Sequence, residues 1–454
     1  MSRTLTRSSV SFLFFCLFLG LCAIGGGSSW PQSASLLYLR PAAIIAACVP
    51  IAIRTVRWDE VRPVLLSLIA AAIVTALQLV PLPPGIWQAL PGHAPYSAAG
   101  VLIGQPNIWR PISVSPDQTW NALIALGVPL SAVIGFAGIR VSEQNRLVPA
   151  LILISLASGF LGVLQIIGGE QSIAYFHAHA SRDLPVGLFT NHNHQALMLV
   201  LTFPLLGTWA TISSLGGHRS TTRRLMIAGG LVPIILPLIL ITGSRAGSAL
   251  ALPALILGIL LSPMRLSWRD RRAWIVILGS IVVVSLLIIV TVVSGRAVAL
   301  ARLAGMVGSE SDLRLRALPT ILTITRDFFP FGFGLGAFDP VFRQYEPDVL
   351  LKLTFYNHAH SDPLEVLMAG GIAAFAVLIV FFAWWVRTAW LLVAASEGQS
   401  DVAYGRLGVA TTTLLMIASV IDYPLRTPLL GVVMVIGLGW MARWRSISDR
   451  QPPR

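Results

Sequence analysis

Long apolar runs follow one another along almost the whole chain, with short polar loops between them. Most runs come close to the roughly 20 residues that an α-helix needs to cross the hydrocarbon core of a bilayer. The pattern predicts an all-α, polytopic membrane protein of about twelve transmembrane helices, forming one integral domain over residues 1–454. The expected segments are residues 10–24, 36–53, 64–80, 120–139, 147–167, 196–215, 225–241, 246–261, 274–293, 364–385, 407–421 and 429–441.

The composition agrees with this pattern. Of the 454 residues, 55% are hydrophobic and 11% are charged, and the mean hydropathy is +0.78. In a typical soluble domain about a quarter of the residues are charged. The three cysteines lie inside the first two apolar runs, where thiols act as small apolar side chains, and their spacing is not that of a metal site.

Arginines gather in the loops on one side of the predicted bundle. By the positive-inside rule this side is the cytoplasm, and both chain ends lie there. The formal net charge of +13 therefore reflects membrane topology, and no nucleic-acid partner is expected. The arginines that mark this side are Arg3, Arg7, Arg54, Arg57, Arg62, Arg140, Arg146, Arg219, Arg223, Arg224, Arg265, Arg269, Arg271, Arg272, Arg443, Arg445, Arg450 and Arg454.

Two long loops are predicted on the opposite side of the membrane. The first, residues 81–119, combines prolines with tryptophans, a mixture suited to the membrane interface. The second, residues 295–363, is longer than a plain connection in a compact protein. We therefore expect it to be functional or to hold helices of its own.

Two histidines, His358 and His360, stand directly before the apolar run that begins at residue 364. Histidine changes its charge near neutral pH, so both side chains are candidates for proton transfer at the membrane edge. Asp362, Pro363 and Glu365 predict a helix start, with Asp362 as the N-cap and Glu365 reaching back as in a capping box. His360 would then lie near the positive end of the helix dipole, where anionic ligands are favoured.

Arg245 lies between two apolar runs with almost no loop to hold its charge in water. It could snorkel to the interface, or it could bind an anion such as a phosphate through its planar guanidinium group. Ser244 and the flanking glycines would allow a ligand or another backbone to come close. We favour anion binding.

Arg314 and Arg316 follow in the second long loop. They could lie on a solvated helix face, or one of them could point into the site that Arg245 faces. Two arginines would suit a diphosphate, which carries more than one negative charge. The glycines of residues 332–336 predict a tight turn, because neither a preceding strand nor a following lysine marks a phosphate loop.

All histidines except His218 fall in predicted external loops, which indicates one working face, although membrane interiors also simply exclude histidines. Asn191, Asn193 and His194 directly precede another apolar run and could hydrogen-bond a sugar or orient a catalytic group. With the later histidines they could also ligate a metal, but no spacing on one helix requires it, so no metal site or cofactor is expected.

Together these motifs resemble the O-antigen ligase and O-antigen polymerase superfamily. The resemblance rests on their order along the chain and spans nearly all of it. The segments that carry it are residues 78–84 (QLVPLPP), 189–194 (FTNHNH), 242–247 (TGSRAG), Arg314, Asp327, 330–338 (PFGFGLGAF) and 359–364 (AHSDPL).

The resemblance implies a GT-C-like glycosyltransferase in the bacterial inner membrane, with its active site on the periplasmic face. Its donor would be a glycan linked to undecaprenyl diphosphate. In the ligases of lipopolysaccharide biosynthesis the acceptor is a lipid A-core sugar, and in the polymerases it is another lipid-linked glycan. Ser361 and Ala369 depart from residues that are frequent in the family, Asn and Glu, which leaves the acceptor open.

The resemblance also assigns roles to residues. Arg245 matches the family's diphosphate-binding arginine, Arg314 best matches the second one with Arg316 as the alternative, and His360 matches the catalytic histidine. His358 lies outside the match and would support the site, together with Asn191, Asn193, His194, Ser244 and Asp362.

The chemistry of the residues predicts the same reaction. A lipid diphosphate is already a good leaving group, so the protein has to neutralise its charge and activate the attacking hydroxyl. Two arginines and one histidine can do this, with inversion at the anomeric carbon and without a metal ion. The rival interpretation, a small-solute transporter, predicts ionisable residues near mid-bilayer and an internal repeat, and the sequence shows neither convincingly.

Overall fold

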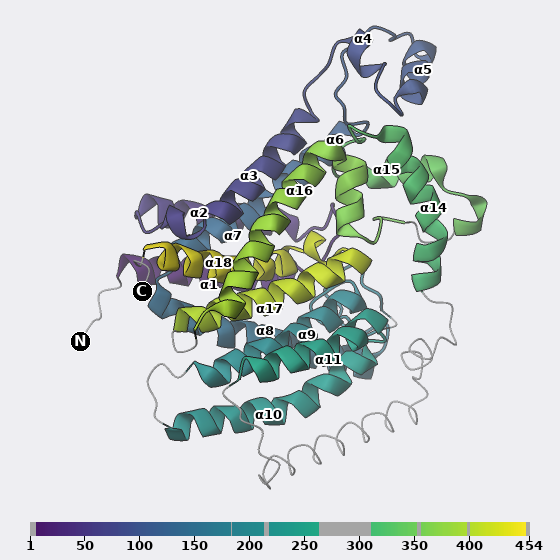
Figure 1. Ribbon diagram of the computed structural model, residues 1–454. Coiled ribbons are helices and arrows are strands. Elements are labelled where there is room, and N and C mark those ends of the chain that lie inside the picture. Colours follow the sequence, from purple (N-terminus) through teal and green to yellow (C-terminus); the bar gives the residue numbers. More distant parts are fainter. Residues whose placement is uncertain are drawn as a thin grey trace.

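The computed structural model describes residues 6–182, 184–212, 218–262, 310–351, 356–396 and 400–450. Throughout these ranges the chain is helical, and its one pairing of extended backbone is the isolated bridge between Leu82 and Arg110. The helices form two parts, a bundle of long apolar helices and a smaller head, which lies at the upper right of Figure 1.

The bundle consists of the long helices and the short helical pieces between them. Its helices are α1 (Arg7–Gly25), α2 (Leu36–Ala52), α3 (Arg62–Leu77), α6 (Pro116–Ala125), α7 (Gly127–Ala137), α8 (Leu147–Gly168), α9 (His192–Thr211), α10 (His218–Ile241), α11 (Arg245–Leu260), α16 (Asp362–Ala394), α17 (Ser400–Ile421) and α18 (Pro428–Arg450). Short 3₁₀ helices are η1 (Trp58–Glu60), η2 (Val141–Arg146), η3 (Asp348–Leu350) and η4 (Pro424–Arg426).

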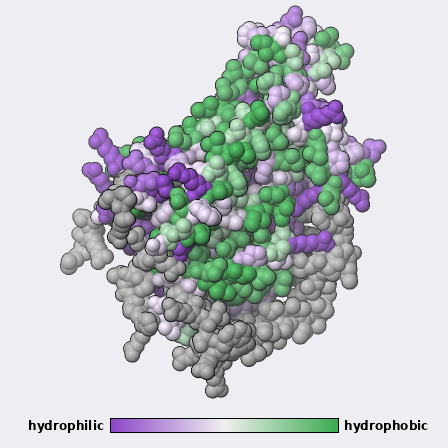
Figure 2. Space-filling model, in the orientation of Figure 1, coloured by the Kyte–Doolittle hydropathy of each residue, from purple (hydrophilic) through white to green (hydrophobic). Residues whose placement is uncertain are grey.

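Helix α18 lies at the centre of the bundle. It packs against α17, α7 and α1, and 78% of its most apolar window is buried, against 28% for α16. The exposed surface of α16 and α3 is nevertheless apolar, with Val380, Trp390 and Ile73 more than half exposed. Figure 2 shows hydrophobic residues spread over this face, as expected for helices in contact with lipid.

Seven helices of the described chain are long and apolar enough to span a membrane: Arg7–Gly25, Pro116–Ala137, Val141–Gly168, Thr221–Ile241, Asp362–Ala394, Ser400–Ile421 and Pro428–Asp449. Each predicted apolar segment coincides with helical structure except residues 274–293, which lie outside the described residues, as do parts of the predicted loop 295–363. The all-α, multi-pass architecture is therefore confirmed, while the number of twelve membrane crossings stays a prediction.

The basic end of the bundle is held together by Arg443 of α18. Its guanidinium group is buried and donates to Glu60 at 2.8 Å, to Gln144 at 3.1 Å and to the carbonyl oxygen of Ile139 at 2.9 Å. Because these partners come from η1, η2 and the end of α7, three of the arginine-rich segments do meet at one end of the molecule.

The head consists of α4 (Pro84–Trp87), α5 (Ala94–Leu102), α14 (Glu310–Phe328) and α15 (Phe338–Tyr345). Its own core joins Phe328 of α14 and Phe342 of α15 to Ala359, just before α16, and to Met368 in the first turns of α16. Both predicted loops thus contain helices. The core of the head packs directly against the residues around His360.

Helix α16 is broken near its N-terminal end. Gly371 has φ of +64°, a conformation that favours glycine, and the amide of Ile372 donates to the carbonyl oxygen of Pro330 at 2.8 Å instead of continuing the helix. The side-chain amide of Gln78 donates to the carbonyl oxygen of Ala369 at 2.9 Å. The first turns of α16 are therefore fixed by Gln78 at the end of α3 and by residues 332–336. Residues 332–336 form a tight turn, as the sequence predicted.

Candidate functional site

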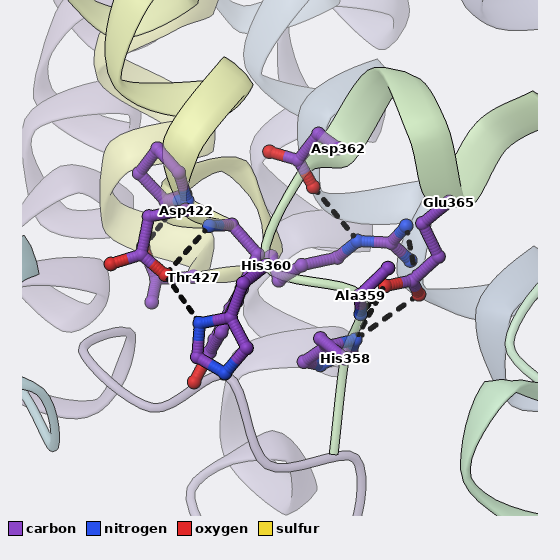
Figure 3. Close-up of polar contacts among 10 residues, drawn as sticks. His358, Ala359, His360, Asp362, Glu365, Asp422 and Thr427 are labelled. Carbon is purple, nitrogen blue, oxygen red and sulfur yellow. Dashed lines mark hydrogen bonds and ion pairs between the residues drawn. The ribbon is translucent and has the colours of Figure 1, made fainter. Parts of the chain in front are cut away.

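His360 lies at the end of the bundle where α17 stops and α16 begins. Its Nδ1 atom is 3.3 Å from Oδ1 of Asp422, the residue that follows α17. The other carboxylate oxygen of Asp422 is 3.4 Å from Nη2 of Arg314, whose Nη1 also donates to the carbonyl oxygen of Ile421 at 2.5 Å. One carboxylate thus joins a predicted catalytic histidine to a predicted diphosphate-binding arginine (Figure 3 draws the pair of His360 and Asp422).

The backbone at His360 is unusual. Its φ is +51°, which a non-glycine residue rarely adopts, and the conformation costs about 1–3 kcal/mol. The loop is held in place on its other side by Glu365, whose Oε2 accepts from the amide of Ala359 at 2.9 Å. Strained backbone that neighbouring contacts hold in place is typical of functional sites.

Asp422 is 4% exposed and remains ionised. Burial alone would raise the pKa of its carboxyl group, but the hydrogen bond from His360 and the positive charge of Arg314 outweigh burial. They hold the pKa below its usual range. The carboxylate is therefore a fixed negative charge that orients the imidazole of His360 through Nδ1.

A second charged cluster surrounds the other histidine. Nδ1 of His358 is 3.1 Å from Oε1 of Glu365, and Arg426 bridges Oε1 of Glu365 and Oδ1 of Asp362 at 3.2 Å each. Figure 3 labels Asp362 and Glu365, the two carboxylates that Arg426 bridges. The charges of Glu365 and Asp362 raise the pKa of Arg426 although burial opposes this, so its guanidinium group stays charged.

This cluster corrects the predicted helix cap. Ser361 is the N-cap of α16, Asp362 is its first residue, and neither side chain caps the helix. Asp362 instead pairs with Arg426, and Glu365 reaches past the cap to His358 and Ala359. Local spacing suggested a cap because the competing partner, Arg426, lies far along the chain and could not be seen in the spacing.

Tyr423 connects the two clusters. Its ring centroid is 4.6 Å from that of His358, 4.8 Å from that of His360 and 5.4 Å from that of His194. The three histidines therefore surround one buried aromatic ring, and His358 lies closer to the site than the family match alone implied.

The residues predicted at the start of α9 have two different positions: one caps the helix and two line a pocket. Asn191 is the N-cap of α9, and its side chain accepts from the amide of Asn193 at 2.8 Å. Asn193 and His194 line a pocket that also contains Asp422. Asn191 thus acts by fixing the helix start, whereas Asn193 and His194 face the pocket.

The residues predicted around Arg245 are arranged in the same way. Ser244 is the N-cap of α11 and accepts from the amide of Gly247 at 3.0 Å. Arg245 is the first residue of this helix and is exposed, and its neighbours Ala246 and Gly247 line the pocket that contains His194 and Asp422. Arg316 is also exposed, and the structure gives it no contact with Asp422 such as Arg314 makes.

Asp422, Tyr423 and Arg426 are the residues that sequence reasoning missed. All three lie in the short connection between two predicted membrane segments, residues 407–421 and 429–441. The signal that drew attention to Arg245, a charge between two apolar runs with almost no loop around it, applies equally to Asp422 and Arg426.

Asp422 supports a prediction about pH. Because its folded pKa lies below the ordinary value of 3.8, its ion pairs contribute to stability above about pH 4 and are lost as the pH falls through the folded pKa. We expect Asp422→Asn to lower the melting temperature at every pH above about 4, because the carboxylate stays ionised there. Thermal unfolding in detergent at several pH values measures this. An unchanged melting temperature in Asp422→Asn would show that these pairs do not stabilise the fold.

The charged side chains at the site pair with one another. Among the residues that the structure describes, no group of three or more His, Cys, Asp or Glu side chains is placed to hold a metal ion. Arg314 forms an ion pair with the carboxylate of Asp422, and Arg426 forms one with the carboxylate of Asp362.

Residues 230–379 match the model of the Wzy_C family, described as O-antigen ligase. The matched range contains Arg245, Arg314 and His360, whereas Asp422 and Arg426 follow it. No curated protein matches the chain. The match confirms the resemblance to the O-antigen ligase superfamily and supports a function of the O-antigen ligase or polymerase type in a membrane.

Proposed function

Since residues 230–379 carry the O-antigen ligase match, we propose that this protein is a membrane glycosyltransferase that moves a glycan from undecaprenyl diphosphate to an acceptor hydroxyl. The acceptor in this proposal is a sugar of lipid A-core. The observation that carries the proposal is Asp422, which holds His360 on one oxygen and Arg314 on the other. A proton acceptor and a phosphate-binding cation are thereby kept side by side.

The reaction can be written through these residues. His360 takes the proton of the acceptor hydroxyl on Nε2, because Nδ1 faces Asp422. The hydroxyl oxygen forms a bond to the anomeric carbon from the face opposite the leaving group, so the configuration is inverted. The bond between that carbon and the diphosphate oxygen breaks, and its electron pair leaves with undecaprenyl diphosphate.

The charged residues of the site assist both the proton transfer to His360 and the departure of the diphosphate. Asp422 orients the imidazole of His360, as the carboxylate does in a catalytic triad. Arg245 and Arg314 neutralise the charge that develops on the diphosphate. Two arginines can supply this charge without a metal ion, so we propose a metal-independent reaction.

The proposed setting is the bacterial inner membrane, with both termini in the cytoplasm and the site at the periplasmic face. The arginine-rich loops of the sequence support this orientation. The site lies at the end of α17 and the basic cluster of Arg443 at the other end of the bundle, where α18 ends. The donor and membrane lipids would reach the site from the side of the bundle.

The experiment is a transfer assay with purified protein in detergent. A glycan on synthetic polyprenyl diphosphate is the donor, and lipid A-core is the acceptor. Product with lipid A-core would support the ligase, whereas extension of the donor glycan instead would support a repeat-unit polymerase. Neither product, with a folded protein, would overturn the proposal and favour a transporter.

The two arginines of α14 provide a matched comparison. Arg314 reaches Asp422, whereas Arg316 is exposed two residues away on the same helix. We expect Arg314→Ala to lower kcat/KM for the donor by about 10–100-fold, because a charge-assisted contact to phosphate is worth about 1.5–3 kcal/mol. Arg316→Ala should stay within about twofold of native protein. The reverse order of effects would assign the second diphosphate arginine to Arg316.

A further inference from the structure

A part of the head, residues 81–110, forms an arm that projects beyond the end of α3. It contains α4 and α5, which lie at the top of Figure 1. The ends of the arm are joined, because the amide of Leu82 donates to the carbonyl oxygen of Arg110 at 2.9 Å. Inside the arm, Nε1 of Trp87 donates to the carbonyl oxygen of Ile108 at 2.9 Å. The arm is therefore a folded element with contacts of its own.

Large apolar side chains lie on the outside of the arm. Leu102 is 87% exposed, Ile103 is 64% exposed and Trp109 is 62% exposed, and every residue from 101 to 109 is exposed. Water is an unfavourable surrounding for apolar surface, so a concentration of this kind marks a contact surface. We call this surface the apolar edge, and its residues are Ile86, Val101, Leu102, Ile103, Ile108 and Trp109.

The arm also carries almost no charge. Arg110 is the only one of its residues that is Asp, Glu, Lys or Arg, and its guanidinium group lies 5.3 Å from the ring centroid of Trp87. By contrast, the other part of the head, residues 310–351, contains ten charged residues. Tryptophan and arginine are residues that proteins place at the boundary between lipid and water. The composition of the arm therefore suits lipid, and that of residues 310–351 suits water.

The apolar edge continues the lipid-facing surface of the bundle. Helix α3 leads into the arm, and its residues Leu66, Ile73 and Leu77 are each more than half exposed. Between Leu77 and Ile86 the only polar side chain is that of Gln78, which is buried. Figure 2 shows hydrophobic residues along this face and at the top of the molecule. No polar break along the chain therefore separates the arm from the lipid-facing side of α3.

The arm is attached to the part of the head that packs against the site. Nε2 of Gln344 on α15 donates to the hydroxyl oxygen of Tyr96 on α5 at 2.9 Å. The ring centroid of His93 is 5.9 Å from that of Phe328, which belongs to the core of the head. The same core packs against the residues around His360. The position of the arm relative to the membrane therefore also sets the position of His360.

We propose that the arm inserts its apolar edge into the lipid layer on the side of the membrane where the site lies. Leu102 and Ile103 enter the boundary between the lipid headgroups and the acyl chains, and Trp109 and Arg110 lie at the level of the headgroups. The partner is the bilayer itself, bound through apolar contact, because a single arginine attracts anionic lipids only weakly. This inference goes beyond the proposed function and does not depend on it.

The test measures how a spin label on the arm meets water and lipid in vesicles of phosphatidylcholine. The full-length protein, with its three cysteines replaced by alanine, carries a nitroxide at Leu102→Cys. Electron paramagnetic resonance then reports collisions of the label with oxygen, which concentrates in lipid, and with a nickel chelate, which stays in water on both sides of the bilayer. We expect collisions with the nickel chelate to be lost at this label.

The matched control is a label at Arg343→Cys. Arg343 is half exposed and lies on α15, in the charged part of the same head. Collisions with the nickel chelate should be retained there. A second variant perturbs the contact: Leu102→Asp should restore these collisions at a label on Ile103→Cys, because an ionised carboxylate resists entry into lipid.

Three outcomes would overturn the inference. Equal collisions with the nickel chelate at Leu102→Cys and Arg343→Cys would place the arm in water. Broadening of the Leu102→Cys spectrum that disappears on dilution with unlabelled protein would show that a second copy of the chain covers the edge. Protection that requires phosphatidylglycerol in the vesicles would replace apolar insertion by a charge contact of Arg110.

The result stays decisive if one variant fails to fold or if the proposed function fails. Should Leu102→Cys not be monodisperse, the label at Ile103→Cys in otherwise unchanged protein gives the same comparison with Arg343→Cys. The spin-label measurement uses no glycan. Absence of glycan transfer by native protein would therefore overturn the proposed function and leave the insertion of the arm standing.

Discussion

Replacing His360 with alanine is expected to lower glycan transfer by about 10²–10⁴-fold, with little change in the melting temperature. The imidazole is the only side chain that the described residues place on Asp422 as a proton acceptor, since the guanidinium group of Arg314 on the other oxygen is a donor only. Without it, the acceptor hydroxyl has no positioned base. The donor should still bind, because Arg245 and Arg314, the arginines that we propose to bind the diphosphate, are unchanged.

Two further variants separate the chemistry of His360 from its backbone. His360→Asn keeps a residue that tolerates positive φ, and it should be as inactive as the alanine variant if the imidazole is what matters. His179→Ala is the control, because His179 is exposed and stacks on Trp30 with ring centroids 4.8 Å apart. Transfer assays with saturating donor measure kcat for all three. Substantial activity in His360→Ala would remove the residue from the reaction.

Replacing Arg426 with methionine is expected to lower the free energy of unfolding by about 3–5 kcal/mol and to abolish transfer. Arg426 bridges Asp362 and Glu365, whose side chains are 13% and 2% exposed. Removing the guanidinium group leaves two buried carboxylates next to each other without a counter-charge. The loop of His358 and His360 depends on Glu365, so the site should be lost together with the stability.

Arg343 provides the control for this prediction. It pairs with Asp339 at 2.7 Å on the surface of α15, with half of its side chain exposed. Arg343→Met should change the free energy of unfolding by about 1 kcal/mol or less. Adding Asp362→Asn and Glu365→Gln to Arg426→Met should restore part of the stability, because the uncompensated charges are then gone. Chemical or thermal unfolding in detergent measures each variant, and equal effects of Arg426→Met and Arg343→Met would contradict the buried bridge.

The candidate site was only partly visible in the sequence. His360 and Arg245 could be selected because each is a charged or titratable residue at the edge of an apolar run, and Arg314 because it matches the family pattern. The common partner of His360 and Arg314 is Asp422, which is 62 residues beyond His360 and belongs to a different connection. The spacing of Asp362 and Glu365 indicates a helix cap. Their actual partner, Arg426, lies in the same connection as Asp422.

By itself the sequence determined the class of the protein and the ends of most helices. A helix long enough to cross a bilayer has to satisfy its backbone internally and present apolar side chains, so every such segment leaves a local signature. The caps Asn191 and Ser244 and the glycine turn of residues 332–336 are equally local. These features depend on residues a few positions apart.

Only the tertiary structure decided which charges pair. The break of α16 at Gly371 is held by Gln78, almost 300 positions earlier, and the orientation of His360 is held by the residue that ends α17. Pairing of buried charges depends on distances of about 3–4 Å between side chains from different helices. Those distances arise from the packing of the helices, which no spacing within one segment of the chain specifies.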